Sequence, residues 1–113
     1  MKAYGLKKCS TCQKAIGFLE GKKVAFTFTD HSVEPPTATQ VKRWAKALGG
    51  WEKLINRAGY TWRGLPDADK EGLTEAKAVA LAVKHPSLIR RPLIEHDDGS
   101  VMVGFTPKVQ SLF

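Results

Sequence analysis

The chain has 113 residues, of which 42% are hydrophobic and 26% charged, the make-up of an ordinary globular protein with one domain. No apolar run is long enough to span a membrane, and the first residues lack the apolar core of a signal peptide. Membrane insertion and export are therefore unsupported by the sequence, and a cytoplasmic protein is expected. The net charge of +7 suits an anionic ligand or a nucleic acid. Because no arginine-rich tail or pattern of stacking aromatics accompanies it, we expect no direct nucleic-acid binding.

The first predicted elements form a strand–helix–strand unit. Residues 2–5 predict a short strand, and the amphipathic pattern of residues 10–20 predicts a helix. Gly21 should end this helix, because glycine readily adopts the left-handed conformation of a helix cap. Residues 24–29 alternate large and small or polar side chains and predict a second strand. A unit of this kind has parallel strands joined by a right-handed crossover.

The middle of the chain is predicted to be helical. Two prolines within residues 30–36 exclude the interior of a strand or helix and predict a linker. Helices are predicted at three places, over residues 37–49, 51–56 and 74–84, with a loop over residues 59–67. Residues 34–85 are therefore expected to be a helical insertion.

The end of the chain returns to strand patterns. Residues 93–103 carry an antiparallel hairpin signal, with the turn sequence Asp-Asp-Gly-Ser at its centre. Thr106 and Pro107 are suited to the cap and the first position of a short C-terminal helix. The whole chain is thus expected to be one domain, with a sheet core of residues 1–33 and 86–113 around the insertion.

The only two cysteines, Cys9 and Cys12, stand where the first strand turns into the first helix. Cβ atoms three residues apart in a helical turn are about 5–6 Å apart, so the two thiols can form a redox pair. The helix N-terminus, with Lys7 and Lys8, favours a thiolate at Cys9, and Cys12 should be the more buried. Inert thiols and structural zinc are the alternatives, but only scattered histidines could complete a zinc site. Thiol chemistry without a metal is favoured.

Three strings, in order along the chain, resemble one known family. They are CSTCQKA at residues 9–15, NRAGYTWR at 56–63 and PSLIRRPL at 86–93, and VGF at 103–105 is similar as well. This is the ArsC/Spx/YffB family, which groups arsenate reductases, small thiol proteins and a redox-sensing transcriptional regulator. The resemblance covers nearly the whole chain. It implies a thioredoxin-like α/β fold, with a glutaredoxin-type βαβ unit and a ββα unit around the helical insertion.

The resemblance also implies roles for individual residues. Cys9 matches the family's nucleophile, Arg63 and Arg91 match arginines that line the cysteine site, and Pro92 falls where thioredoxin-like folds keep a cis proline. The chemistry of arginine supports this independently, because a planar, permanently charged guanidinium suits oxyanions and carboxylates and stabilises a nearby thiolate. The alternative is that Arg63 merely lies in a solvated loop.

The chain departs from the arsenate reductases in one respect that bears on the substrate. Those enzymes carry a third arginine after the hairpin, near residues 105–107, where this chain has none. Arg90 and Lys8 are further candidate cations at the site, and Lys108 is the cation nearest to the missing arginine. Arg90 could equally lie in a solvated loop. We therefore expect weak or absent arsenate reduction.

Together these features favour a thiol-dependent oxidoreductase that acts on a small anionic substrate or a glutathione mixed disulfide. Cys9 would attack as the thiolate, and Cys12 would resolve the mixed disulfide. No tightly bound cofactor is expected; glutathione or another thiol would be the reductant, and glutaredoxin or thioredoxin are candidate partners. The alternative is a Spx-like regulator that binds RNA polymerase and uses the Cys9–Cys12 pair as a redox switch. A third reading is a thiol protein without catalysis.

Overall fold

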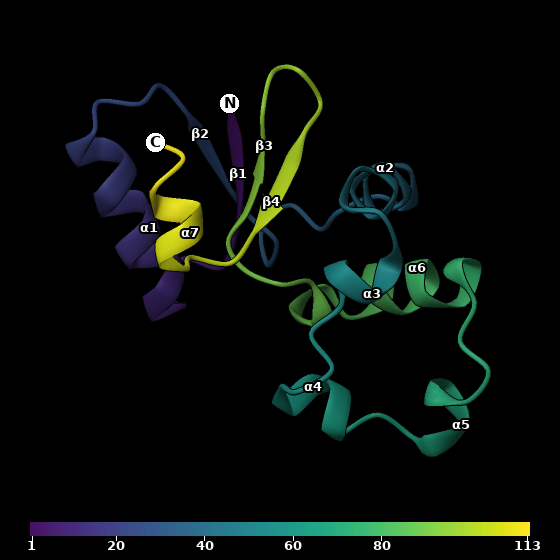
Figure 1. The fold of residues 1–113 in the computed structure, drawn as a ribbon. Helices are drawn as coiled ribbons and strands as arrows, with labels where there is room; N and C mark the ends of the chain where they lie inside the picture. Colours follow the sequence, from purple (N-terminus) through teal and green to yellow (C-terminus); the bar gives the residue numbers. More distant parts are fainter. The chain divides into compact units, whose positions relative to one another are not determined.

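The computed structural model describes residues 1–113, and the chain forms two units (Figure 1). We call the first, Met1–Glu34 with Arg91–Phe113, the sheet unit. The second, Pro35–Arg90, is the helical unit.

The sheet unit contains a four-stranded sheet with the strand order β2-β1-β3-β4. Its elements in chain order are β1 (Lys2–Gly5), α1 (Ser10–Gly21), β2 (Thr27–Asp30), β3 (Leu93–Glu95), β4 (Val101–Val103) and α7 (Pro107–Gln110). Strands β1 and β2 are parallel and joined through α1, whereas β3 is antiparallel to both β1 and β4. The predicted strand–helix–strand unit, hairpin and C-terminal helix are therefore all present.

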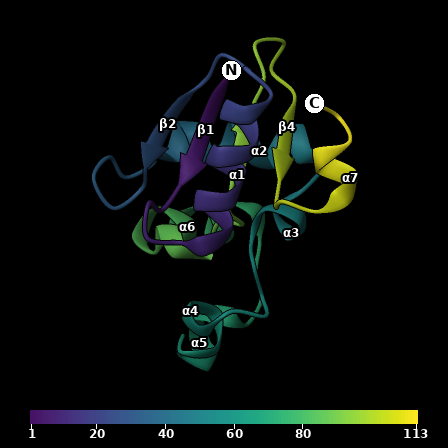
Figure 2. The same cartoon turned by 90° about the vertical axis from the view of Figure 1, so that its left-hand side faces the viewer.

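Helices α1 and α7 lie on the same face of this sheet, as Figures 1 and 2 show. Between α1 and the strands, the side chains of Ala3, Leu19 and Ile94 are buried together. Partly buried hydrophobic side chains surround them, from Met1, Phe18, Val24, Phe26, Phe28, Met102 and Phe113. Because Leu19 of α1 packs with residues of two neighbouring strands, this core holds α1 against the sheet.

The end of α1 differs from the prediction at Gly21. The helix runs through Gly21, and the left-handed residue is Lys23, with φ 56°. Its N–H donates to the carbonyl of Glu20, and the N–H of Val24 donates to that of Leu19, the two bonds of a Schellman ending. The hydrogen-bond pattern and the burial of Val24 decide where the turn falls, rather than the presence of glycine. Strand β2 starts at Thr27 instead of residue 24, because Thr27 pairs with Lys2, the first residue of β1.

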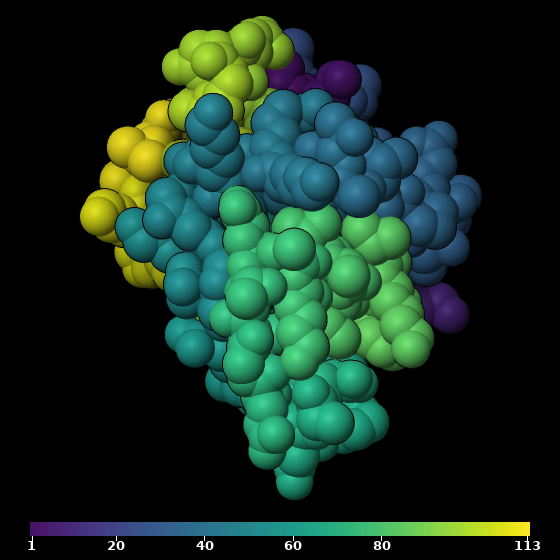
Figure 3. All heavy atoms as spheres, turned by 90° about the vertical axis from the view of Figure 1, so that its right-hand side faces the viewer, coloured from purple at the N-terminus to yellow at the C-terminus, as the bar shows by residue number.

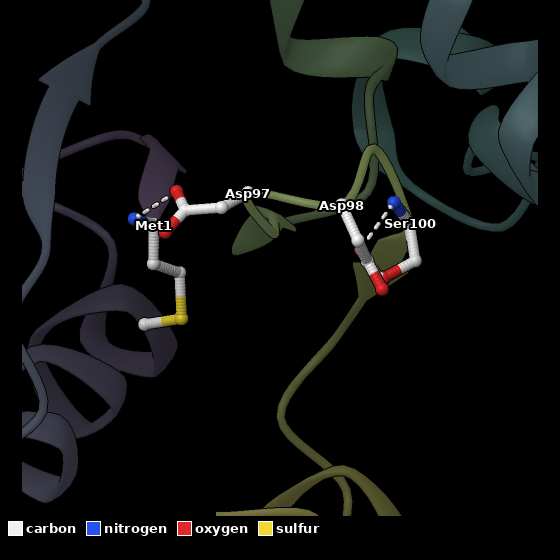
Figure 4. A network of polar contacts seen from close by, with 4 residues as sticks. All are labelled: Met1, Asp97, Asp98 and Ser100. Atoms are coloured by element: carbon white, nitrogen blue, oxygen red, sulfur yellow. Dashed lines mark hydrogen bonds and ion pairs between the residues drawn. The ribbon is translucent and has the colours of Figure 1, made fainter.

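The β3–β4 hairpin is closed by a turn whose polar groups bond locally. Asp98 accepts hydrogen bonds at Oδ1 from the backbone N–H of Ser100 at 2.9 Å and from its hydroxyl at 2.6 Å, and Gly99 is left-handed with φ 89°. Next to it, the N-terminal ammonium of Met1 donates to Asp97 Oδ1 at 2.8 Å (Figure 4). This ammonium lowers the pKa of the Asp97 carboxyl. The contact ties the start of β1 to the hairpin.

The helical unit is built from one large helix pair and several short turns. Its elements are α2 (Ala38–Leu48), α3 (Trp51–Leu54), α4 (Tyr60–Arg63), α5 (Asp67–Lys70), α6 (Glu75–Lys84) and the 3₁₀ turn η1 (Pro86–Leu88). Helix α2 begins with a capping box between Thr37 and Gln40 and packs against α6, beside which it is seen in Figure 3. Trp44 is fully buried in this unit. None of the helices combines the length and the apolar character needed to cross a membrane.

The segment predicted as a loop over residues 59–67 is partly helical. Helix α4, Tyr60–Arg63, lies in its first half, and α5 begins at its last residue, Asp67. A helix of one turn is too short to produce a periodic hydrophobic pattern, so the sequence could not reveal it. The guanidinium of Arg63 lies 4.9 Å from the centre of the Tyr60 ring, and the ammonium of Lys70 lies 5.9 Å from that of Trp62. Such contacts between cations and aromatic rings stabilise these exposed turns modestly.

Candidate active site

Cys9 stands at the N-cap of α1, in a loop that is fixed from two sides. Its N–H donates to the carbonyl of Leu6 at 3.0 Å, and its carbonyl accepts from the N–H of Gln13 at 3.0 Å. The side-chain amide of Gln13 donates to the Lys7 carbonyl at 2.9 Å. From the other side, the N–H of Lys7 donates to Asp30 Oδ2 at 3.1 Å. The loop before Cys9 is thus anchored both to α1 and to the end of β2.

The two thiols differ in exposure, as the sequence predicts. Both cysteines are free, Cys9 is partly exposed, and Cys12 is completely buried. The sulfur of Cys12 packs against the backbone of Gly5, so closely that a Cβ at residue 5 would lie 2.6 Å from it. Glycine at this strand position therefore makes room for the buried thiol.

The surroundings of Cys9 favour the thiolate. Burial alone would raise the pKa of Cys9, but hydrogen bonds from the backbone and thiol of Cys12, from the backbone of Thr11 and from the Arg91 side chain outweigh it and lower the pKa. At Cys12, burial dominates and raises the pKa to about 11, with the nearby Cys9 adding to the rise. Cys9 is therefore the thiol that ionises more readily, and the Cys12 thiol donates a hydrogen bond to it.

Arg91 and Pro92 complete the site on the side of β3. The peptide bond between them is cis, and Pro92 is buried, with its carbonyl accepting from the N–H of Gly104 at 2.9 Å. Arg91 is half-buried and within hydrogen-bonding reach of the Cys9 thiol. The structure therefore brings together Cys9, Cys12, Arg91 and Pro92.

The other predicted cations are found in different surroundings. Lys8 is exposed in the turn directly before Cys9. Arg63 and Arg90 belong to the helical unit, where both are exposed. Arg63 lies over the Tyr60 ring, and the backbone N–H of Arg90 donates to the Leu54 carbonyl at 2.9 Å. A role for either at the cysteine site remains a prediction.

Sequence reasoning missed two residues at the end of β2, Asp30 and His31. Asp30 holds the Lys7 loop, and hydrogen bonds from Ser32 and from Lys7 lower the pKa of its carboxyl. His31 is buried with its ring stacked on Tyr4, the ring centres 6.0 Å apart, and its backbone N–H donates to the Gly5 carbonyl at 2.8 Å. The Asp-x-Ser pattern after a strand is a turn signal that could have drawn attention to Asp30.

His31 was considered from sequence only as one of three histidines with no metal spacing. No group of three or more His, Cys, Asp or Glu side chains capable of holding a metal ion occurs in the structure. Burial lowers the pKa of His31 to about 4; the Asp30 carboxylate opposes this shift and the Arg91 charge adds to it. The imidazole is therefore neutral at physiological pH, next to the cation that serves Cys9.

The first prediction concerns the reactivity of the two thiols. At neutral pH, iodoacetamide should modify Cys9 and spare Cys12, because only Cys9 is both accessible and partly ionised. Peptide mapping after a pH series should give a midpoint for Cys9 below the usual thiol range. Labelling in denaturant, which exposes both residues, is the control. First labelling at Cys12, or a need for alkaline pH at Cys9, would contradict the assignment.

The second prediction concerns acid stability. Because the pKa of His31 is about 4 in the folded protein and 6.5 is its ordinary value, the unfolded chain binds a proton that the folded protein excludes. Stability should therefore fall as the pH drops from about 6.5 towards 4, and a loss of about 2 kcal/mol is expected by about pH 5. Urea unfolding of the wild type and of His31→Gln at neutral pH and at about pH 5 isolates this contribution. An identical change in both proteins would show that His31 does not cause it.

Comparisons with known proteins find relatives that match nearly the whole chain. A model of the ArsC family matches residues 4–111. A solved structure named YFFB protein is 40% identical, with a TM-score of 0.91, over 98% of this chain and 96% of its own. An arsenate reductase (ArsC) related protein from Brucella melitensis is 38% identical, with a TM-score of 0.78, over 99% and 92% of the two chains.

A regulator is among the relatives as well. The global transcriptional regulator Spx 1 of Lactococcus lactis is 29% identical over 98 residues, which are 86% of this chain and 75% of the regulator. The match to the family model covers nearly every element of both units, and the structural likeness confirms the thioredoxin-like α/β fold. This chain belongs to the ArsC family.

Proposed function

We propose that this protein is a thiol-dependent oxidoreductase in which Cys9 is the nucleophile. One observation carries the proposal: Cys9 is the partly exposed thiol at the start of α1, and hydrogen bonds from Cys12 and Arg91 favour its thiolate. A thiolate held in this way reacts with disulfides and other soft electrophiles at neutral pH. The substrate would be a glutathione mixed disulfide or a small anion, and the pair would work in a reducing compartment such as the cytoplasm.

The reaction would proceed in two exchanges. The Cys9 thiolate attacks one sulfur of the substrate disulfide, forms a mixed disulfide and releases the other half as a thiolate. Cys12 then attacks the Cys9 sulfur, which releases the second thiol and leaves a Cys9–Cys12 disulfide. Two glutathione thiols, or a glutaredoxin or thioredoxin, would return the pair to the reduced state.

Cys12 can act in the second exchange although the pKa of its free thiol is about 11. The thiolate of Cys9 is one of the causes that raise this pKa, by its negative charge and by the hydrogen bond it accepts. Once Cys9 is in a mixed disulfide, both contributions vanish, while Arg91 still favours an anion at Cys12. The first exchange would thus prepare the second thiol.

Cations around Cys9 would hold an anionic substrate. Arg91 and Lys8 are the candidates in the sheet unit. For Arg63 and Arg90, the role in substrate binding is proposed from the sequence resemblance alone. The Brucella relative is described as arsenate reductase related. Residues 105–107 contribute no guanidinium here, and one missing donor to a developing charge costs about 10²–10³ in rate. Arsenate would therefore be a poor substrate.

A thiol-consumption assay across three substrate classes tests the proposal. The panel contains the mixed disulfide of glutathione with 2-mercaptoethanol, arsenate, and a small disulfide-containing protein, each with glutathione as the reductant. Turnover of the mixed disulfide that requires Cys9 is the expected result. Consumption at the uncatalysed rate on the whole panel would exclude the enzyme.

A second candidate function is a redox-sensing regulator, favoured by the likeness to Spx 1 and by the free Cys9–Cys12 pair. Such a protein would bind RNA polymerase, and oxidation of the pair would change the affinity. Binding to purified polymerase before and after mild oxidation, without turnover on the panel above, would support it. If the protein is an enzyme, we expect turnover on the panel and no redox-dependent binding to the polymerase.

A further inference from the structure

A hollow beside the Cys9 loop is not used by the reaction described so far. It lies within the sheet unit and is lined by Lys7, Phe28, Thr29, Asp30, Val33 and Glu34. Its volume is about 390 Å³ when the open solvent at its mouth is included. Its lining therefore comes from the loop before Cys9, from β2 and from the turn that follows β2. Because the N–H of Lys7 is bonded to Asp30, one wall of the hollow is continuous with the loop that presents the nucleophile.

Residues of opposite charge line this hollow without forming an ion pair with each other. Lys7 supplies an ammonium, and Asp30 and Glu34 supply two carboxylates, but no ion pair within 4.0 Å joins them. Asp30 is held ionised by its bonds to Ser32, with Oδ1 accepting from the N–H at 2.8 Å and from the hydroxyl at 2.6 Å. The N–H of Glu34 donates to the Asp30 carbonyl at 2.9 Å, which fixes the two acidic residues in one turn.

The hollow also has apolar walls. Phe28 is half-buried, and Val33 is 76% exposed, one of the few large hydrophobic side chains left in solvent. A ligand that covers Val33 and Phe28 with a short aliphatic chain would gain from their burial. Its charged end would need both an ammonium for the carboxylates and a carboxylate for Lys7. An α-amino acid group on a short chain has this combination.

We infer that this hollow binds the α-amino acid end of a low-molecular-weight disulfide substrate while Cys9 attacks its sulfur. The ammonium of the ligand would lie towards Glu34 and Asp30, its carboxylate towards Lys7, and its methylene groups against Phe28 and Val33. This inference rests on the proposed function for the reaction, but the binding site itself does not depend on it. Cystine and oxidised glutathione both carry such an end, at different distances from the disulfide, and the experiment separates them.

Kinetics on four disulfides test the inference. The Cys9 thiolate attacks one sulfur, the enzyme becomes a mixed disulfide, and the released thiolate takes a proton from water. Rate constants from intact mass are compared for cystine, oxidised glutathione, cystamine, which lacks the carboxylate, and the neutral bis(2-hydroxyethyl) disulfide. Each rate constant is divided by the rate constant of the same disulfide with a free reference thiol. One of the two amino acid disulfides should then react fastest, and this result shows whether the hollow suits cystine or oxidised glutathione.

Two variants make this comparison specific. Glu34→Gln should lower the ratio of the amino acid disulfide rate to the neutral disulfide rate about two- to fivefold, the size of one exposed charge contact. Glu20→Gln makes the same change on an exposed residue of α1 outside the hollow and should leave the ratio as it is. Equal ratios in wild type and Glu34→Gln, or no preference for amino acid disulfides, would overturn the inference.

Binding without chemistry separates the hollow from the proposed reaction. In isotope-labelled Cys9→Ser protein, S-methylcysteine should give saturable amide shifts at Lys7, Val33 and Glu34, whereas 2-(methylthio)ethanol should not. Shifts together with an unreactive Cys9 in the wild type would refute the proposed function and keep the site. Absence of these shifts, or equal shifts with both compounds, would refute the site whatever the kinetics show.

Discussion

Cys9→Ser is expected to abolish thiol–disulfide exchange, with a loss of at least about 10³-fold in turnover, because an alcohol at this position stays protonated and is a poor nucleophile. The hydrogen bonds that lower the pKa of the Cys9 thiol cannot bring a serine hydroxyl into the neutral range. The measurement is glutathione-dependent reduction of a mixed disulfide by each purified variant, with circular dichroism to confirm folding.

Cys12→Ser is the matched control, and its expected result is different. A serine hydroxyl can still donate to the Cys9 thiolate, so the first exchange should continue, but the second exchange has lost its thiol. Intact mass should then show a glutathione adduct that accumulates on Cys9. Full turnover by Cys12→Ser would mean that a second glutathione resolves the adduct directly. Retained activity in Cys9→Ser would remove Cys9 from the mechanism altogether.

The parts of this fold that could be predicted are those that depend on local sequence. The helix after the cysteines, the hairpin around Asp-Asp-Gly-Ser and the caps at Thr37 and Thr106 are local signals, and each is found in the structure. The exposed and buried members of the cysteine pair follow from their positions at a helix start. The one-turn helices α4 and α5 are too short for a periodic pattern, and Lys23 takes the left-handed position for reasons of hydrogen bonding.

The features around the site that could not be predicted depend on contacts between distant segments. The bond from Lys7 to Asp30 joins residues 23 positions apart, and it decides how the Cys9 loop is held. His31 becomes a buried neighbour of Tyr4 only because β1 and β2 pair with Gly5 opposite Asp30. Likewise, nothing in the sequence distinguishes Gly5 from an ordinary strand residue, because the need for glycine comes from the Cys12 sulfur that packs against it. Each of these becomes visible only once the parallel pairing is known.

The contact between Gly5 and Cys12 leads to the second large effect. In Gly5→Ala, the added Cβ would lie 2.6 Å from the Cys12 sulfur, and a completely buried short side chain has little freedom to move away. We expect a loss of about 3 kcal/mol in the free energy of unfolding, the upper part of the range for overpacked cores. Displacement of the Cys12 thiol should also weaken its hydrogen bond to Cys9 and raise the Cys9 pKa towards its ordinary value. Urea unfolding and the pH series of Cys9 alkylation measure the two effects.

Two further variants establish that the clash is the cause. Gly17→Ala makes the same substitution on α1, where nothing lies within 4 Å of the new Cβ, and should stabilise the protein by about 0.5–1 kcal/mol because alanine favours a helix. Cys12→Ala removes the sulfur, so adding Gly5→Ala to it should cost much less than in the wild type, which a double-mutant cycle measures as a favourable coupling. A Gly5→Ala protein as stable as Gly17→Ala, or a cycle without coupling, would show that the strand moves aside and that Gly5 does not position Cys12.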